Sequence, residues 1–423
     1  MKRRILFVFL ALVLVVSLAA FAACAKEEEA PPVVEEEEPP VVEEEEEPPV
    51  VEEVWEWPDK FLVASQGAAT VQYAMQAAWT AYLEQDTGMK CRLVVNEDPV
   101  IGRLWSKTGM LQLGTIQAGT SEDSKGTGKW GTRELGPWQH HIVWTQLKGG
   151  MGYAVKGDSG IKTPYDIKPG MKILYLSFLV PTGRQWMESL LAWGQVDPED
   201  VEWVAGGNIN AMFTMLREGK VDVSVGWPSG PGWLELEASP GGLSWIELNS
   251  DEDPEGAKRY LEIDPTVGFG PYGTTGAPSA AGVWMQSSLH SYSSAWDTDP
   301  ELIYNLVKWL DENYDKYKGS HPLCVHMVIE NIMTLAETSF MPIHAGTVKY
   351  LEEKGLWTPA HEARRQQNID LIDRYIEAHK TAIAMADERG IAVDPANEEW
   401  DELWENYKKE LELPEYMMFV TFP

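Results

Sequence analysis

Apolar and polar positions follow a repeating pattern through the first third of the chain. Residues 61–64 form an apolar run that ends in a turn of small and polar residues, 65–70. Apolar side chains then recur at helical spacing, at Val71, Ala74, Met75, Ala78 and Tyr82. A second apolar run, 92–95, follows. Strand, loop, helix and strand in this order predict a βαβ unit, whose two strands are parallel.

The same order returns in the middle of the chain. Apolar runs at 172–176, 201–204 and 221–225 predict three strands, and apolar residues at helical spacing predict a helix in each gap between them. These residues therefore predict a second α/β lobe. Beyond residue 280, helical spacing predicts helices over about 301–318, 326–337, 360–389 and 398–411.

The N-terminal residues have the order of an export signal. A basic start at residues 1–4 precedes an uncharged apolar run, 5–20, and small residues close it at Ala22-Ala23-Cys24. The alternative is a transmembrane anchor, for which the run is somewhat short, since spanning takes about 20 apolar residues. Residues 21–24 also resemble a bacterial lipobox, with Phe21 in place of the usual Leu, so we expect Cys24 to carry a lipid. Cys24 is otherwise a residue beside an ordinary cleavage site.

A charged spacer separates this signal from the apolar pattern. Residues 31–53 repeat Pro-Pro-Val-Val followed by a run of Glu three times, and residues 24–56 hold 15 Glu and one Lys. Like charges repel and Pro-Pro is stiff, so we expect an extended, disordered spacer that keeps a folded module clear of a membrane.

Composition excludes several classes of protein. The chain has 423 residues and a net charge of −32, which disfavours nucleic acid as a partner, because nucleic-acid binding relies on concentrated Lys and Arg. Three cysteines are too few for a disulfide scaffold or a four-Cys zinc site. Cys91 and Cys324 could pair after export or remain buried thiols.

Two loops are the candidate ligand site. Open parallel sheets bind ligands beyond the carboxyl ends of their strands, and a helix N-terminus there favours an anionic group. The predicted ligand-binding residues lie on these loops or on strand ends near them: Ser65, Gln66, Thr70, Tyr73, Thr182, Gly183, Arg184, Trp186, Asn208, Trp227 and Ser229. Arg184 would offer a fork of donors to a carboxylate, and the tryptophans would wall its carbon skeleton.

Some of these residues have simpler interpretations. Thr70 and Asn208 are typical helix caps, and capping alone would explain them. Arg184 lies in the first turn of its helix and could form a surface ion pair. Tyr73 could belong to the core or to a cleft wall.

Four stretches resemble the TAXI family, the solute-binding subunits of one group of tripartite ATP-independent periplasmic (TRAP) transporters. They are ASQGAATVQYAMQAAW (64–79), VKGDSGIKTPYDIKPGMKILYLS (155–177), INAMFTMLREGKVDVSVGW (209–227), and HPLCVHMVIENI together with FMPIHAGTVKYLEEKGLW (321–357). The resemblance covers about residues 61–357. The first loop has fewer Gly and Thr than the family pattern, so the solute's identity does not follow from it.

The resemblance implies a two-lobe α/β fold of the type 2 periplasmic binding proteins, with mixed, mostly parallel sheets and added C-terminal helices. The implied domains are a lipoprotein-type signal (1–23), the spacer (24–56), lobe 1 (57–150), lobe 2 (151–264), a return to lobe 1 (265–359) and a helical extension packed on lobe 1 (360–423). The chain would cross between lobes near residues 151–156 and 263–273.

The implied function is transport. A small organic acid, amino-acid-like or a dicarboxylate, would bind between the lobes outside the cytoplasm and pass to TRAP membrane subunits, without cofactor, metal or chemical change. The alternative keeps the fold and changes the partner, to an ABC importer or a sensor.

A hydrolase is the rival class. Ser159 and Lys162 match Ser-x-x-Lys, and residues 107–109 match Lys-Thr-Gly, the motifs of penicillin-recognising enzymes. Their order along the chain is reversed and the Ser-Asp-Asn motif is absent between them, so we interpret the matches as coincidence. His140 and His141 are neighbours on a predicted strand and would face opposite sides, which disfavours a shared metal.

Overall fold

The computed structural model describes residues 55–65, 67, 70–96, 99–117, 122–177, 179 and 182–416. The predicted signal, the lipidated Cys24, nearly all of the spacer and the predicted ligand residue Gln66 lie outside the described residues. Every element below belongs to residues 56–416.

The predicted βαβ unit is confirmed. Strand β1 (Lys60–Ser65) pairs in parallel with β2 (Lys90–Val95), with Lys60 opposite Lys90. Helix α2 (Val71–Thr87) connects the two strands and packs on both. It begins after Thr70, whose hydroxyl accepts a hydrogen bond from the backbone N–H of Tyr73, and it ends at Gly88 in the left-handed conformation that glycine adopts without steric cost.

Long-range pairing extends this sheet. A parallel bridge joins Val63 to Leu113, just before β3 (Gly114–Gln117). Strand β10 (Trp284–Ala295) then lies between β3 and β4 (His140–Lys156), antiparallel to both. The helices between β2 and β4 are α3 (Pro99–Lys107), α4 (Glu122–Lys125) and the short helix η2 (Gly128–Trp130). We call this sheet and the helices on it lobe 1.

A second sheet repeats the arrangement. Strand β5 (Lys172–Leu176) pairs in parallel with β6 (Glu202–Gly206), and a parallel bridge joins Ile173 to Val223, just before β7 (Ser224–Gly226). The C-terminal half of β4 is antiparallel to both β7 and β8 (Leu243–Ile246). The helices are η3 (Pro164–Asp166), α5 (Thr182–Trp193), α6 (Ala211–Arg217), α7 (Pro231–Glu237) and α8 (Pro254–Leu261). We call this group lobe 2.

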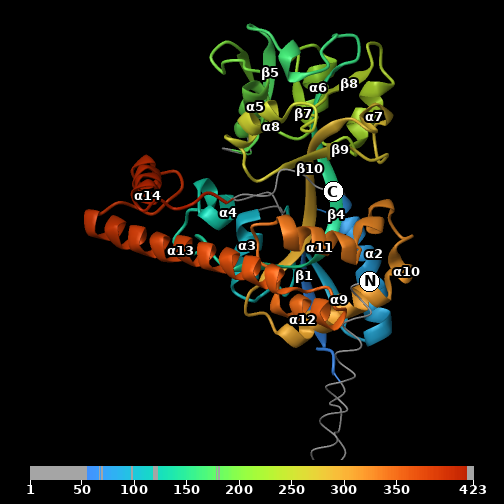
Figure 1. Cartoon of the computed structure of the whole chain (residues 1–423), viewed down its shortest axis with the longest axis vertical. Helices are drawn as coiled ribbons and strands as arrows, with labels where there is room; N and C mark the ends of the chain where they lie inside the picture. The colour runs from blue at the N-terminus through green and yellow to red at the C-terminus, as the bar shows by residue number, and fades with distance from the viewer. Residues whose placement is uncertain are drawn as a thin grey trace, which may run out of the picture. The chain divides into compact units, whose positions relative to one another are not determined.

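Two strands therefore join the lobes. The strand directions follow from the pairing: in lobe 1 only β10 runs against the others, and among β4 to β8 of lobe 2 only β4 does. The predicted two-lobe α/β fold with mixed sheets is confirmed. Most strands of each lobe run in one direction, although five of the seven strand pairs in the described residues are antiparallel. Strands β4 and β10 lie side by side and run from one lobe into the other (Figure 1). The first predicted crossing, 151–156, falls within β4.

The second crossing lies later than predicted. Strand β9 (Gly268–Pro271) pairs with the start of β10, and η4 (Pro278–Ala280) packs on β8. Phe269 and Met285 belong to the same buried cluster as Tyr153, in the core of lobe 2. The chain thus stays with lobe 2 past the predicted boundary at 264, and β10 carries it into lobe 1.

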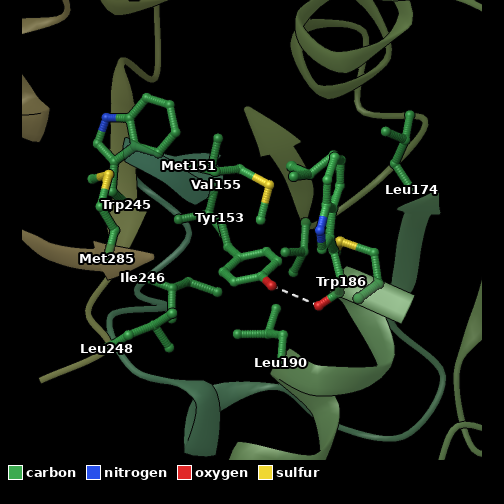
Figure 2. Close-up of a cluster of buried hydrophobic side chains, with 14 of the residues drawn as sticks. Met151, Tyr153, Val155, Leu174, Trp186, Leu190, Trp245, Ile246, Leu248 and Met285 are labelled. Carbon is green, nitrogen blue, oxygen red and sulfur yellow. Dashed lines mark hydrogen bonds between the residues drawn. The ribbon is translucent and has the colours of Figure 1, made fainter. Parts of the chain in front are cut away.

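Two tyrosine hydroxyls form hydrogen bonds inside the core of lobe 2. Tyr153 on β4 donates to the backbone carbonyl of Trp186 on α5 over 2.5 Å (Figure 2). The Tyr153 hydroxyl oxygen also lies 2.8 Å from that of Tyr260. Both rings are fully buried, so these bonds satisfy the polar atoms that the core encloses. They also fix the start of α5 relative to β4.

Helices form the C-terminal part of lobe 1. They are α9 (Pro300–Glu312), α10 (Tyr314–Tyr317), η5 (Pro322–His326), α11 (Ile329–Thr338) and α12 (Ala345–Glu353). Cys324 is a buried free thiol and Cys91 a half-buried one, so the two do not pair in this structure.

The C-terminal extension consists of α13 (Pro359–Arg389) and α14 (Glu398–Glu410), and it packs on lobe 1. The Trp400 indole donates to the carbonyl of Gly131, and the Trp404 indole donates to that of Gly126. Arg133 pairs with Asp387 on α13. Among the described residues, no helix is both long and apolar enough to cross a membrane.

Candidate functional site

A cavity of about 650 Å³ lies where β4 and β10 pass between the lobes. Gly149 and Gly150 of β4 and residues 285–287 of β10 contribute to it. Both lobes supply the rest of its lining. Lobe 1 contributes α2, α3, β3, α4, η2 and η5, and lobe 2 contributes Leu179, α5, Ile209, the segment after β7, and the end of β9 with the segment after it. This is the edge of the sheets where the fold was expected to hold a ligand.

Arg103 on α3 is a cation of the cavity wall whose guanidinium is held by two other residues. Its Nε lies 3.2 Å from Oδ2 of Asp123, and its Nη1 donates to the backbone carbonyl of Thr115 over 3.0 Å. Two of the three guanidinium nitrogens are thereby fixed by lobe 1, and the side chain lines the cavity. A guanidinium held in this way is suited to binding a carboxylate, because little side-chain freedom remains to be lost.

A network of buried hydrogen-bonding residues contacts Arg103 through Asp123. Asp123 is only 1% exposed, and its Oδ1 accepts from the backbone N–H of Ser124. The Ser124 hydroxyl lies 2.8 Å from Nε2 of His140, which stacks on Trp138. Burial raises the pKa of the Asp123 carboxyl and the Arg103 guanidinium opposes that rise. The serine and histidine are fully buried, so this network orients the arginine rather than meeting a solute.

The other acidic and basic side chains that line the cavity, among the described residues, are also in lobe 1. They are Glu122, Lys129, Lys148, His290 and His326. Burial lowers the pKa of His290 to about 4 and also lowers that of His326, so both imidazoles are neutral at pH 7. At that pH the positive charge comes from Arg103, Lys129 and Lys148.

Lobe 2 supplies an aromatic wall. The rings of Trp186 and Trp227 meet edge to face, with centroids 5.7 Å apart. Tyr272 lies against β4, where a Cβ added to Gly150 would be 2.5 Å from its ring, so glycine is needed for this approach. Ile209 and Met285 extend the apolar surface, and Ser229 and Thr275 add hydroxyls.

Gln286 on β10 brings an unsatisfied amide to the cavity. The side chain is 1% exposed, and neither its amide nitrogen nor its oxygen has a hydrogen-bond partner in the described part of the chain. Buried amides are nearly always paired, because an unpaired one keeps the cost of leaving water. A bound molecule that both donates and accepts would satisfy it.

Four of the residues expected from the sequence line this cavity: Thr182, Trp186, Trp227 and Ser229. Ser65, Thr70 and Tyr73 do not, although Val71 and Gln72 beside them do. Thr70 caps α2, and the Asn208 side chain accepts from the backbone N–H of Ala211 at an exposed position before α6. The simpler interpretation as a helix cap matches Thr70. The N-cap position of α6 is Asn210, and Asn208, two residues earlier, satisfies the first N–H of the helix.

Arg184 lies away from the cavity. Its Nε is 2.8 Å from the carboxylate of Glu188, one helical turn along α5, and its side chain is 47% exposed. The guanidinium covers the ring of Trp203 at 4.2 Å. It borders a second hollow, of about 540 Å³, whose lining includes Glu405 and Lys408 of α14. Gly183 before it packs against the backbone of Leu176, where a side chain would clash.

The sequence reasoning missed Arg103, Lys148, His290 and Gln286. Arg103 lies on a short helix between the predicted elements, and the other three lie on β4 and β10, whose pairing joins residues more than 130 positions apart. The pair Gly149-Gly150 inside a long strand was a usable signal, since glycine within a strand marks a close approach.

The residues of the hydrolase motifs are not brought together. The Ser159 hydroxyl accepts from the backbone N–H of Ile161 in an exposed turn, and Lys107 donates to the carbonyl of Glu134 over 2.9 Å in lobe 1. His140 and His141 contact different partners, Ser124 and Gln139. In the part of the chain that the structure describes, no group of three or more His, Cys, Asp or Glu could hold a metal.

Comparisons with known proteins give one partial family match and distant structural likenesses. A sequence model of the NMT1-like family matches residues 292–355, from the end of β10 to α12. No curated protein matches the chain.

Solved structures resemble the chain at low identity. The R. palustris protein Rpa4515, solved with adipate, is 14% identical with a TM-score of 0.40, over 61% of this chain and 84% of its own. The periplasmic VFT2 domain of Bordetella pertussis BvgS is 10% identical (TM-score 0.37; 64% and 93% covered). The alkanesulfonate-binding protein SsuA of Xanthomonas axonopodis pv. citri, bound to MOPS, is 13% identical (TM-score 0.34; 79% and 95% covered).

Proposed function

We propose that this protein is an extracytoplasmic solute-binding subunit that captures a small organic anion between its two lobes. One observation carries the proposal. The chain has a net charge of −32, yet among its described residues three cations and one carboxylate line a cavity between the two lobes. The surrounding charge would repel an anion unless a local cationic wall offsets it, and Arg103 is held in position for that purpose.

The architecture supports capture without chemical change. Two crossing strands join the lobes, so a solute bound to lobe 1 gains contacts from lobe 2 only when the lobes meet. Thr182 and Trp186 at the start of α5 would supply those contacts. Binding would then favour the closed form by the free energy of these added contacts.

We also propose the partner of the protein and its attachment to the membrane. The four stretches that resemble the TAXI family favour delivery of the solute to TRAP membrane subunits, and residues 1–24 favour export and a lipid on Cys24. The alternative is a binding lipoprotein of an ABC importer or a sensor. Neighbouring genes discriminate: a large multi-span TRAP subunit supports the first assignment, and an ATPase with a permease contradicts it.

Thermal unfolding of the full chain against a panel of organic acids and neutral sugars tests the capture of an anion. A solute that binds only the folded form raises the melting temperature. We expect an acid to do so, and we expect Arg103→Gln to abolish the shift. Arg217→Gln, at an exposed position on α6, is the matched control and should keep it. A shift with a sugar and with no acid would contradict the proposal.

Membrane attachment needs its own measurement. Cys24→Ser should release the chain from membranes into the soluble extracytoplasmic fraction if a lipid on Cys24 is the anchor. Retention of this variant in the membrane fraction would contradict lipidation and leave the solute-binding proposal untouched.

A further inference from the structure

The two walls of the cavity differ in charge. Among the described residues, every Lys, Arg, His and Glu that lines the cavity belongs to lobe 1. These residues lie on α3, the 122–130 segment, β4, β10 and η5. Among the described residues that lobe 2 adds, there is no Lys, Arg, His, Asp or Glu. A bound solute therefore meets charge at one end only.

The excess positive charge on the lobe 1 wall is small. Arg103 is backed by the carboxylate of Asp123, and Glu122 opposes one of the two lysines. About one unit of positive charge remains, which matches one carboxylate. A second carboxylate would have to leave water for the lobe 2 wall, where no cation would replace its hydration.

The lobe 2 wall is suited to a flat ring. The rings of Trp186 and Trp227 pack edge to face, with an interplanar angle of 82°. Tyr272, which also lines the cavity, covers Gly150 of β4. Aromatic surfaces in this arrangement favour another ring by edge-to-face and stacked contacts, beyond the gain from apolar area alone.

The amide of Gln286 adds a polar requirement at the same end. Gln286 lies opposite Met151 in the β10–β4 ladder, four residues before His290 and on the lobe 2 side of the crossing. Its unpaired nitrogen and oxygen can donate to and accept from one hydroxyl group. Without such a partner the buried amide disfavours a wholly apolar tail.

We propose that the solute is an aromatic monocarboxylate with a polar substituent on its ring. The carboxylate binds at Arg103 and Lys148, the ring lies against Trp186, Trp227 and Tyr272, and the substituent reaches Gln286. This inference rests on the proposed function, because it names the class of solute for the same cavity.

Calorimetric titration of the full chain tests the class with a matched set of acids. The probes are 4-hydroxyphenylacetate, phenylacetate, hexanoate, adipate and the neutral 4-hydroxyphenylacetamide. We expect 4-hydroxyphenylacetate to bind about tenfold or more tightly than adipate or hexanoate, and the neutral amide to bind least. Adipate binding as tightly as the aromatic acids would overturn the inference, and the proposed capture of an organic acid would stand.

Two variants separate the contributions. Trp227→Leu should weaken both aromatic acids severalfold and leave hexanoate unchanged. Gln286→Leu, of similar volume, should remove the preference for 4-hydroxyphenylacetate over phenylacetate. Trp296→Leu, at a position 60% exposed, is the control and should change neither.

The failure of the parent proposal gives a different result. If none of the five probes binds and no organic acid of the thermal-unfolding panel raises the melting temperature, both proposals are contradicted. If phenylacetate binds to the Trp227→Leu variant as tightly as to the unaltered chain, the ring site alone is contradicted.

Discussion

The hydroxyl of Thr182, the first residue of α5 in lobe 2, donates a hydrogen bond to Oε1 of Glu122 in lobe 1 over 2.9 Å. The two residues are 60 positions apart, and both line the cavity. This bond joins the lobes directly beside the candidate site. A ligand that favours the closed form would therefore favour this bond as well.

Removal of the Thr182 hydroxyl should weaken solute binding. Thr182→Val keeps the shape of the side chain and loses the donor, and a bond of this kind contributes about 0.5–1.5 kcal/mol. We expect a solute that raises the melting temperature of the unaltered chain to bind roughly three- to tenfold more weakly, as measured by calorimetry. Glu122→Gln keeps an acceptor oxygen and should lose less. Equal affinity of Thr182→Val and the unaltered chain would show that the bond does not contribute to closure.

Replacing Asp123 should lower the free energy of unfolding more than replacing an exposed ion-pair residue. Asp123→Ala leaves the Arg103 guanidinium without its buried partner, and breaking such a pair costs about 3–5 kcal/mol. Because Arg103 borders the cavity, water can reach it, so we expect the lower end of this range in urea unfolding. Asp387→Ala, which removes an exposed partner of Arg133, is the control and should leave the urea midpoint unchanged. Similar losses from both variants would contradict the structural role of the buried network.

Stability should fall as the pH falls below about 6.5. Burial lowers the pKa of His290, His344 and His379 to about 4 each. Between pH 6.5 and 4 the unfolded chain binds protons on these histidines that the folded chain does not, so unfolding is favoured by on the order of 1.4 kcal/mol per pH unit for each residue. Asp264, whose pKa burial raises to about 6, has the opposite effect over pH 3.8 to 6. Burial also raises the pKa of Asp123, but these are two carboxyls against three imidazoles.

Urea midpoints at pH 7, 6, 5 and 4.5 check this dependence. They should decrease with each step, and His344→Gln should flatten the slope because one of the buried imidazoles is gone. A midpoint that rises between pH 6.5 and 5 would contradict the assignment of neutral buried histidines.

The C-terminal extension should support the site through Trp404. Its indole nitrogen lies 3.1 Å from the carbonyl oxygen of Gly126 and 3.2 Å from that of Lys125, in the segment that carries Glu122 and Lys129 to the cavity. Trp404→Phe leaves these carbonyls without their donor, which should destabilise the fold by about 1–3 kcal/mol. Trp296→Phe, at an exposed position, should have no effect on the urea midpoint. An unchanged midpoint for Trp404→Phe would show that water replaces the indole.

The sequence and the structure give Arg184 different roles, and a substitution can discriminate between them. As a ligand residue it would be needed for binding an acid, whereas in the structure it pairs with Glu188 on the surface of α5. An exposed pair one helical turn apart contributes about 0.3–0.5 kcal/mol, so Arg184→Ala should leave both the melting temperature and the affinity nearly unchanged. A tenfold loss of affinity for an acid would return Arg184 to the site.

The sequence by itself determined the features that depend on near neighbours. Apolar runs and helical spacing identified β5, α5 and the βαβ unit of β1, α2 and β2, because side chains one to four positions apart decide which face of an element is buried. The cap at Thr70 and the alternative of an ion pair for Arg184 were available for the same reason.

Only the tertiary structure decided which side chains meet in the cavity. Gln286 and Gly150 lie in the same β10–β4 ladder, and Asp123 holds the Arg103 guanidinium. Both contacts depend on strands and loops far apart in the chain, whose pairing register no local pattern encodes. That register places the charge on lobe 1, where the sequence had offered Arg184 of lobe 2. The distribution of charge between the walls is thus a property of the folded chain, since burial and pairing across more than 130 residues determine it.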